Sequence, residues 1–96
     1  MKLFAVIRTF GAAYEPSLPL ERQPEWTAHA VFMDALLSAG FVVLGGPLEG
    51  SADTLLIFRA GSPDEIMTRL EGDPWTANGM LRVSRISPWG LRLGSV

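Results

Sequence analysis

TLLIFRAGSPDEIMTRLEGDPWTANG, residues 54–79, contains a strand, a helix and a turn in close succession. Thr54 to Arg59 is rich in β-branched and aromatic residues, which favour a strand. Ser62-Pro63-Asp64-Glu65 is a capping box with proline at the first helical position, and it predicts the start of a helix that ends at Gly72. Asp73-Pro74 then opens a short turn. This stretch forms the second half of the fold.

Three more strands and one more helix are expected around this stretch. Each has apolar residues in a strand or helix pattern and is bounded by glycine or proline. The expected segments are a strand from Lys2 to Phe10 stopped by Gly11, a helix from about Pro24 to Ala39 terminated by Gly40, a strand Phe41 to Leu44 ended by Gly45-Gly46-Pro47, and a last strand from roughly Met80 to Trp89. The order of elements is therefore βαββαβ.

This order predicts an α+β fold of the ferredoxin-like type, as one domain over residues 1–96. Two helices would pack on one face of a four-stranded antiparallel sheet. In the first strand Leu3, Ala5 and Ile7 point one way, while Phe4, Val6 and Phe10 point the other, so both faces are apolar. Helices on one face leave the other open to water, and a second copy of the chain is the natural cover. We expect a homodimer joined sheet to sheet.

Composition excludes several classes of protein. Eight basic and ten acidic residues give a net charge of −2, which argues against a nucleic-acid-binding protein. The chain has no cysteine and one histidine, so neither a disulfide framework nor a transition-metal site is expected. The first apolar run is interrupted by Arg8 and is too short for a signal peptide, and no apolar stretch is long enough to span a membrane. We expect a cytoplasmic protein with no membrane partner and no cofactor.

The single histidine, His29, lies on the apolar face of the first predicted helix. Trp26, Ala30, Met33 and Leu37 recur at three- and four-residue steps, and His29 falls among them. Its ordinary pKa of about 6.5 suits proton transfer near neutral pH. The alternative is a neutral histidine near the core that is hydrogen-bonded to a backbone carbonyl.

Asp73 is the candidate partner of His29. Asp followed by Pro is also an ordinary helix cap, and the two roles are compatible because a capping carboxylate keeps further lone pairs. A carboxylate near the imidazole would fix its tautomer and stabilise the imidazolium ion. The sequence has no strained Gly-x-Ser-x-Gly turn to hold a nucleophile, so acid–base chemistry fits better than covalent catalysis.

Four other residues are candidates for substrate binding. Gly46-Pro47 follows the second strand without the lysine of a phosphate-binding loop, and its small residues would let the backbone approach a ligand. Trp75 would cover a pocket or anchor the short turn by packing. Arg8 would pair with a ligand anion or lie at a solvated strand end.

Several of these residues together resemble the YCII-related (YciI-like) family of small dimeric α+β barrel proteins. The resemblance covers almost the whole chain and is carried by His29, Gly40, Gly46-Pro47, Asp73-Pro74-Trp75 with Gly79, and the Ile86-Ser87-Pro88-Trp89 ending. It implies a ferredoxin-like dimer with His29 and Asp73 paired in an active-site pocket. The wider superfamily includes cofactor-free enzymes on small cyclic or aromatic compounds, such as lactone isomerases and dehydrochlorinases. The long connector Gly11 to Gln23 departs from shorter members.

Our leading hypothesis is a cofactor-independent enzyme that performs elimination or isomerisation on a small cyclic or aromatic compound. His29 would move the proton and Asp73 would orient the imidazole. One alternative is a non-catalytic ligand-binding or regulatory dimer in which the same two residues are structural partners. A second alternative is a cofactor-free monooxygenase of the same fold.

Overall fold

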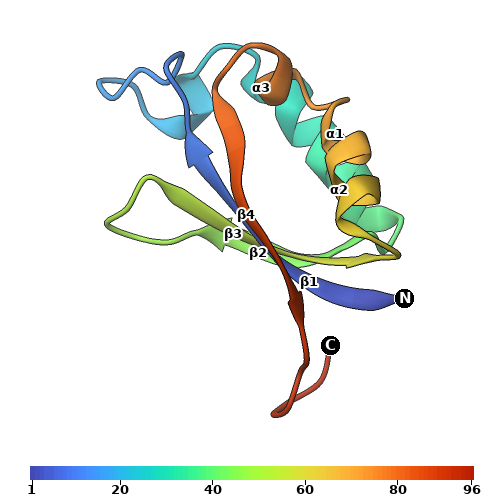
Figure 1. The fold of residues 1–96 in the computed structure, drawn as a ribbon. Helices are drawn as coiled ribbons and strands as arrows, with labels where there is room; N and C mark the ends of the chain where they lie inside the picture. The colour runs from blue at the N-terminus through green and yellow to red at the C-terminus, as the bar shows by residue number, and fades with distance from the viewer.

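The computed structural model describes all residues from Met1 to Val96 and confirms the predicted order of strands and main helices. Figure 1 shows these elements along the chain. A short 3-10 helix in the connector and a one-turn helix after Asp73 complete them. The elements are β1 (Lys2–Phe10), η1 (Leu20–Arg22), α1 (Trp26–Ser38), β2 (Val42–Pro47), β3 (Asp53–Ala60), α2 (Pro63–Leu70), α3 (Pro74–Ala77) and β4 (Leu81–Trp89).

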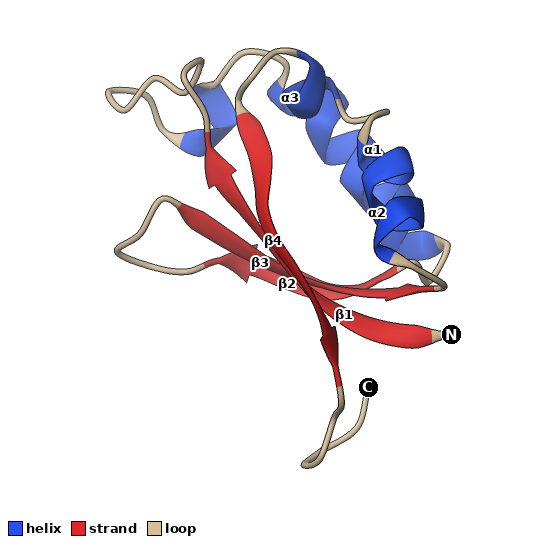
Figure 2. Ribbon diagram, viewed as in Figure 1, coloured by secondary structure: helices blue, strands red, loops and turns tan.

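The four strands form one antiparallel sheet in the order β2-β3-β1-β4. The helices all lie on one side of this sheet (Figure 2). β1 is a central strand, and its pairing with β4 shifts register between Ile7 and Arg8. The arrangement is the predicted ferredoxin-like α+β fold, with a central strand that carries side chains directly beneath the helices.

Several element boundaries differ from the sequence prediction, and two of the differences have a clear structural cause. β2 does not end before its glycines: Gly45, Gly46 and Pro47 continue the strand and pair with β3. A glycine is needed at position 45 because a Cβ there would lie 2.4 Å from a methyl carbon of Leu56. The first helix begins at Trp26 rather than at Pro24, since Glu25 adopts a left-handed conformation with a φ of 63°.

The main core lies between the sheet and the helices α1 and α2. It contains Phe4, Val6, Leu36, Phe41, Val42, Leu56, Phe58, Ala60, Ile66 and Leu70. On α1 the buried residue of the last turn is Leu36, whereas Leu37 is 52% exposed, so the expected apolar face is rotated by one residue there. His29 lies on the buried side of the same helix, as predicted.

A second, smaller core lies at the far end of the sheet, beneath the connector. Trp75, Met80 and Leu81 form its buried centre, and residues of β1, the connector and α1 pack around them. Gly11 and Gly79 touch here: a Cβ on Gly11 would lie 2.2 Å from the Gly79 carbonyl oxygen. This close approach fixes the end of β1 against the turn that follows α3.

The opposite face of the sheet carries half-buried apolar side chains, among them Leu3, Ala5, Ile7 and Leu55. No helix covers this face (Figure 2). Trp89, at the end of β4, is 39% exposed. The prediction that both faces of the sheet are apolar is therefore confirmed. None of the helices has the length and apolar character needed to cross a membrane.

Candidate active site

Asp73 is the centre of the candidate site. It lies between α2 and α3, and its Oδ1 accepts a hydrogen bond from the backbone N–H of Trp75 at 2.9 Å. The following proline occupies the first helical position, so the local sequence forms the cap that was predicted. The Asp73 side chain has no exposed surface. A carboxylate in such a place requires further partners, because burial of an unpaired charge is costly.

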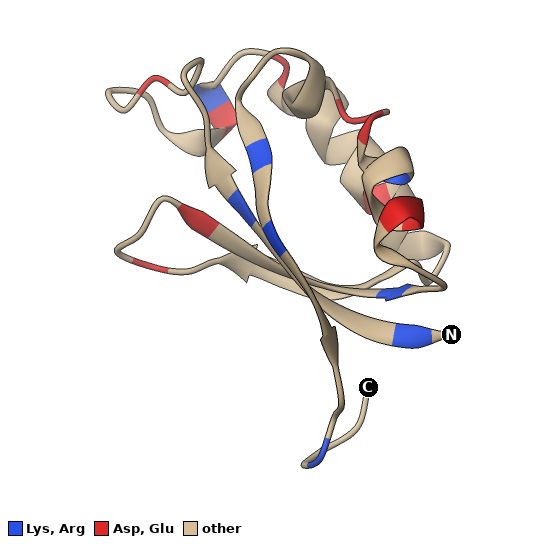
Figure 3. Cartoon of the chain, viewed as in Figure 1, with Lys and Arg blue, Asp and Glu red and all other residues tan.

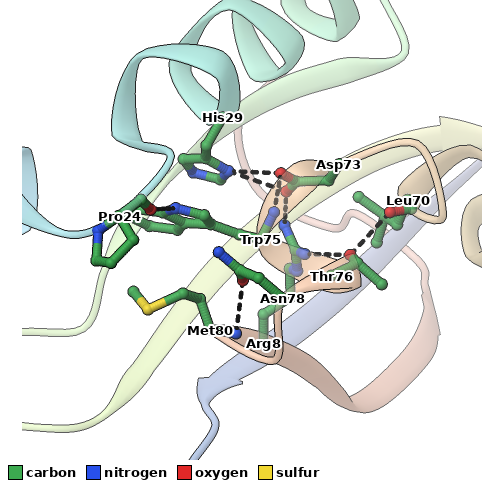
Figure 4. Close-up of polar contacts among 9 residues, drawn as sticks. All are labelled: Arg8, Pro24, His29, Leu70, Asp73, Trp75, Thr76, Asn78 and Met80. Atoms are coloured by element: carbon green, nitrogen blue, oxygen red, sulfur yellow. Dashed lines mark hydrogen bonds and ion pairs between the residues drawn. The ribbon is translucent and has the colours of Figure 1, made fainter. Parts of the chain in front are cut away.

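His29 is one of these partners. Its Nδ1 lies 2.9 Å from both carboxylate oxygens of Asp73, across 44 positions of sequence (Figure 4). His29 is only 9% exposed, and α1 brings it over the start of α3. The predicted contact between the imidazole and the late carboxylate is confirmed. The alternative of a histidine bonded to a backbone carbonyl is wrong, since Asp73 occupies Nδ1.

The charge state of Asp73 determines the tautomer of His29. Burial raises the pKa of Asp73, but hydrogen bonds from His29, from the Trp75 backbone and from Arg8, together with the charge of Arg8, hold it below its ordinary value of 3.8. An ionised carboxylate only accepts hydrogen bonds, so Nδ1 of His29 carries the proton. The Nε2 lone pair of the neutral ring is then available.

Nε2 of His29 forms no hydrogen bond within the chain. The only side-chain nitrogen or oxygen that is both fully buried and without a hydrogen-bond partner is Arg8 Nε. Because His29 Nε2 also has no partner, it must keep some exposure to solvent. One nitrogen of the imidazole therefore binds a buried carboxylate, and the other is unpaired and not fully buried. This is the arrangement that a general base requires.

Trp75 supports the imidazole from below. The two rings are stacked, with centroids 3.9 Å apart and planes 7° from parallel. Trp75 is 1% exposed, and its Nε1 donates to the carbonyl oxygen of Pro24 at 2.7 Å. Of its two predicted roles, anchoring by packing is the one observed. Trp26 completes the aromatic group, with its ring 5.7 Å from that of Trp75.

The position of Arg8 differs from the one expected from the sequence. It was expected to meet a ligand anion or to lie at a solvated strand end, but it is only 1% exposed. Its Nη1 donates to Asp73 Oδ2 at 2.8 Å, and its Nη2 donates to the Thr76 hydroxyl at 2.8 Å. The anion that Arg8 binds is thus the Asp73 carboxylate of the same chain. The physical reason is its position in β1, on the same face as Phe4 and Val6, which points it under the helices.

Gly46 and Pro47 are not brought to the His29–Asp73 pair. They lie on the edge strand β2, and β3 separates them from β1. No side-chain hydrogen bond joins them to His29 or Asp73, so their role toward a ligand stays a prediction.

The largest cavity lies beside the network and does not include the imidazole. It measures about 760 Å³ and opens between the connector, α2, α3 and β4. Its walls are formed by Gly11, Ala12, Ala13, Met67, Leu70, Glu71, Thr76, Asn78, Gly79, Leu81, Arg82 and Val83. No three His, Asp or Glu side chains lie close enough together to form a metal site.

Thr76 is a member of the site that sequence reasoning missed. Its hydroxyl accepts from Arg8 and donates to the Leu70 carbonyl oxygen at 2.8 Å. Nothing in the sequence distinguishes this threonine from a surface one. Arg8 could have been recognised, because it continues the alternation of Phe4 and Val6 and so belongs to the buried face of the strand.

Comparison with known proteins supports the fold. The sequence matches no protein-family model and no curated protein. A solved structure of similar fold is 5-chloro-2-hydroxyhydroquinone dehydrochlorinase from Burkholderia phenoliruptrix AC1100, in complex with 2,5-dihydroxybenzoquinone. The TM-score is 0.68 with 24% sequence identity, over 92% of this chain and 93% of that chain. The class defined by this likeness is a ferredoxin-like α+β fold, and membership of the YCII-related family stays a prediction.

Proposed function

We propose that this chain is a cofactor-independent enzyme that uses His29 and Asp73 for acid–base chemistry on a small cyclic or aromatic compound. The observation that carries the proposal is the different bonding of the two imidazole nitrogens: Nδ1 is held by a buried carboxylate, and Nε2 has no hydrogen-bond partner and is not fully buried. An imidazole held in this way can accept a proton at Nε2 and return it. We propose the cytoplasm as its location, as composition predicts.

The proposed reaction is an elimination or an isomerisation. In an elimination, His29 Nε2 takes a proton from a hydroxyl group or a saturated carbon of the ring in its non-aromatic (keto) form, the released electron pair forms a double bond, and the leaving group departs from a saturated carbon with its own bonding pair. In an isomerisation, the imidazolium returns the proton to another atom of the substrate. Asp73 stabilises the imidazolium in both reactions, and a positioned base of this kind contributes about 10²–10⁴ in rate.

The substrate class is proposed from two sources. The half-buried Trp26, whose ring centroid lies 6.0 Å from that of His29, gives the site aromatic surface, which suits a flat ring. The dehydrochlorinase of similar fold acts on 5-chloro-2-hydroxyhydroquinone, as its name states, and was solved with 2,5-dihydroxybenzoquinone. These compounds are therefore the first probes for this chain.

We further propose that the protein works as a homodimer joined through the open sheet face. Leu3, Ala5, Ile7 and Leu55 lie there with no covering element. A sedimentation mass of two chains at micromolar concentration is the expected result, and Leu55→Glu should dissociate the pair because it places a charge in an apolar contact. A wild-type mass of one chain would exclude a homodimer through this face of the sheet.

A non-catalytic ligand-binding or regulatory dimer is the second candidate. The observation that favours it is the location of the largest cavity, whose walls include neither His29 nor Asp73. In that case His29 and Asp73 would only stabilise the fold. His29→Ala would then lower the free energy of unfolding by about 1–3 kcal/mol with no reaction to lose.

The test compares turnover by the wild type and by His29→Ala. The probes are 5-chloro-2-hydroxyhydroquinone, related chlorinated hydroquinones and unsaturated lactones, assayed without oxygen for chloride release or ring absorbance. We expect at least one probe to be converted, and turnover by His29→Ala to fall about a hundredfold or more. Asp34→Asn is the matched control, since Asp34 is an exposed residue on the same helix.

Two results would count against the enzyme. Equal turnover by the wild type and by folded His29→Ala would remove the histidine from the reaction. Binding of 2,5-dihydroxybenzoquinone with no conversion of any probe would favour the ligand-binding dimer. In a separate assay with oxygen present, oxygen uptake with a phenolic probe would indicate the monooxygenase alternative.

A further inference from the structure

Arg8 is a buried charge that the proposed reaction does not use. It approaches Asp73 from the side of the sheet, while His29 approaches the same carboxylate from α1 (Figure 4). The one salt bridge between permanently charged groups joins Arg8 to Asp73, and His29 contacts the same carboxylate. The Nε of Arg8 has no hydrogen-bond partner although it is fully buried. A donor left unpaired in this way costs stability, so stability alone is a poor explanation for an arginine here.

We propose that Arg8 is a positioning residue for His29. It balances the charge of Asp73 and helps to hold the carboxylate, so that Asp73 orients His29 as an Nδ1–H imidazole with a free Nε2 without driving it to the imidazolium. The inference deepens the proposed function and rests on it for its catalytic meaning.

The first part of the argument is the charge balance. An isolated carboxylate 2.9 Å from an imidazole strongly favours the charged imidazolium, which has no lone pair left to act as a base. Arg8 is 2.8 Å from the same carboxylate, and its charge offsets that of Asp73. The arginine, the aspartate and the neutral histidine therefore have a net charge of zero. Addition of a proton to His29 would give the three groups a net charge of +1, so Arg8 limits how strongly Asp73 favours the imidazolium.

The second part is geometric. Arg8 Nη1 binds Asp73, and Nη2 binds Thr76, which in turn bonds the end of α2 through Leu70. One planar guanidinium thus connects the cap of α3 with its first turn. The hydrogen bond from Arg8 to Oδ2 and that from the Trp75 backbone to Oδ1 together hold the carboxylate, and the carboxylate then orients the imidazole.

Other charged groups around the site make no ion pair with it. The connector and α1 contribute exposed Glu21, Arg22 and Glu25, the end of α2 contributes exposed Glu71, and β4 contributes exposed Arg82. Figure 3 shows that the basic residues of β1 and β4 lie on neighbouring strands. Arg82 carries the same charge as Arg8 but is open to water, where its field is screened. It is therefore a suitable control for Arg8.

The test is the titration of His29 by NMR, which needs no substrate. Because this chain has one histidine, its imidazole signals are assigned without ambiguity, and nitrogen chemical shifts report the tautomer. In the wild type we expect the Nδ1–H form. In Arg8→Gln the midpoint of the His29 titration should rise by about one unit or more, because the Asp73 charge is no longer offset. Arg8→Lys keeps the charge and should stay within about 0.3 units of the wild type.

Arg82→Gln should leave the midpoint within about 0.2 units, since it removes an exposed charge. A folded Arg8→Gln protein that titrates like the wild type would overturn the inference. So would an Nε2–H tautomer in the wild type at neutral pH.

A second variant covers the case in which Arg8→Gln does not fold. The double substitution Arg8→Met with Asp73→Asn removes both buried charges and leaves none unpaired. If Arg8 offsets Asp73, the midpoint of His29 in this double variant stays within about 0.3 units of the wild type. A fall of about one unit or more would show that Asp73 acted on His29 without compensation, and would overturn the inference. Failure of the enzyme proposal leaves these titrations unaffected, so the two can be rejected separately.

Discussion

Ser62 and Asp73 are two helix caps with the same local sequence pattern and different surroundings. Each precedes a proline and accepts a backbone N–H from the first turn of its helix, at 3.2 Å from Glu65 and 2.9 Å from Trp75. The Ser62 side chain makes only this one bond, in a loop at the end of β3. Asp73 also binds His29 and Arg8 and is fully buried.

The difference between the two caps comes from what lies beside them. α2 begins next to open solvent, so a neutral hydroxyl is sufficient. α3 begins where α1 and the central strand β1 meet, and the side chains that those elements bring there are a histidine and an arginine. A cap motif in a sequence therefore does not tell whether the capping group is also part of a site.

The largest effect should come from Asp73→Ala. It removes the α3 cap and leaves the Arg8 charge buried without a partner, so the free energy of unfolding should fall by about 3–5 kcal/mol. Urea unfolding followed by tryptophan fluorescence measures this loss. A loss no larger than an ordinary cap deletion would mean that Arg8 finds water or another partner, and the two caps would then be equivalent.

A smaller effect should follow from acid, because protonation leaves the Asp73 atoms in place. The pKa of Asp73 is lowered in the folded chain, so its contribution to stability is fully present above its ordinary value of 3.8. That contribution is lost as pH falls through the lower folded value. The free energy of unfolding should therefore decline in the acid range, and the decline should be shallower in Asp73→Asn. Identical pH profiles for the two proteins would contradict this assignment.

The smallest effect should come from Ser62→Ala. Loss of this half-buried hydroxyl cap should cost about 1 kcal/mol. The same urea titration measures it, and the titration of His29 should not change, because Ser62 has no contact with the network. If Ser62→Ala moved the His29 midpoint, the distinction between the two caps would fail.

Much of the fold could be predicted from local signals, and the site only in part. The capping box at Ser62 and the strand pattern of residues 54–59 predicted elements that the structure contains. The extension of β2 through Gly45 and Gly46 was missed, because glycines normally end a strand and only the pairing with β3 holds them in it. The burial of Arg8 was missed because a charge on a strand is usually at the surface. The alternation of Phe4, Val6 and Arg8 along the strand nevertheless indicates that Arg8 lies on the buried face.

The sequence by itself determined the order of the elements, the apolar character of both sheet faces and the presence of a lone histidine and an Asp-Pro cap. These are properties of neighbouring residues, and periodicity and capping chemistry express them directly. Only the tertiary structure decided that Arg8, His29 and Asp73 meet, and that Nδ1 of the imidazole is the bound nitrogen. The reason is physical: a charge is retained in the interior only where its partners arrive together, and these three come from distant parts of the chain.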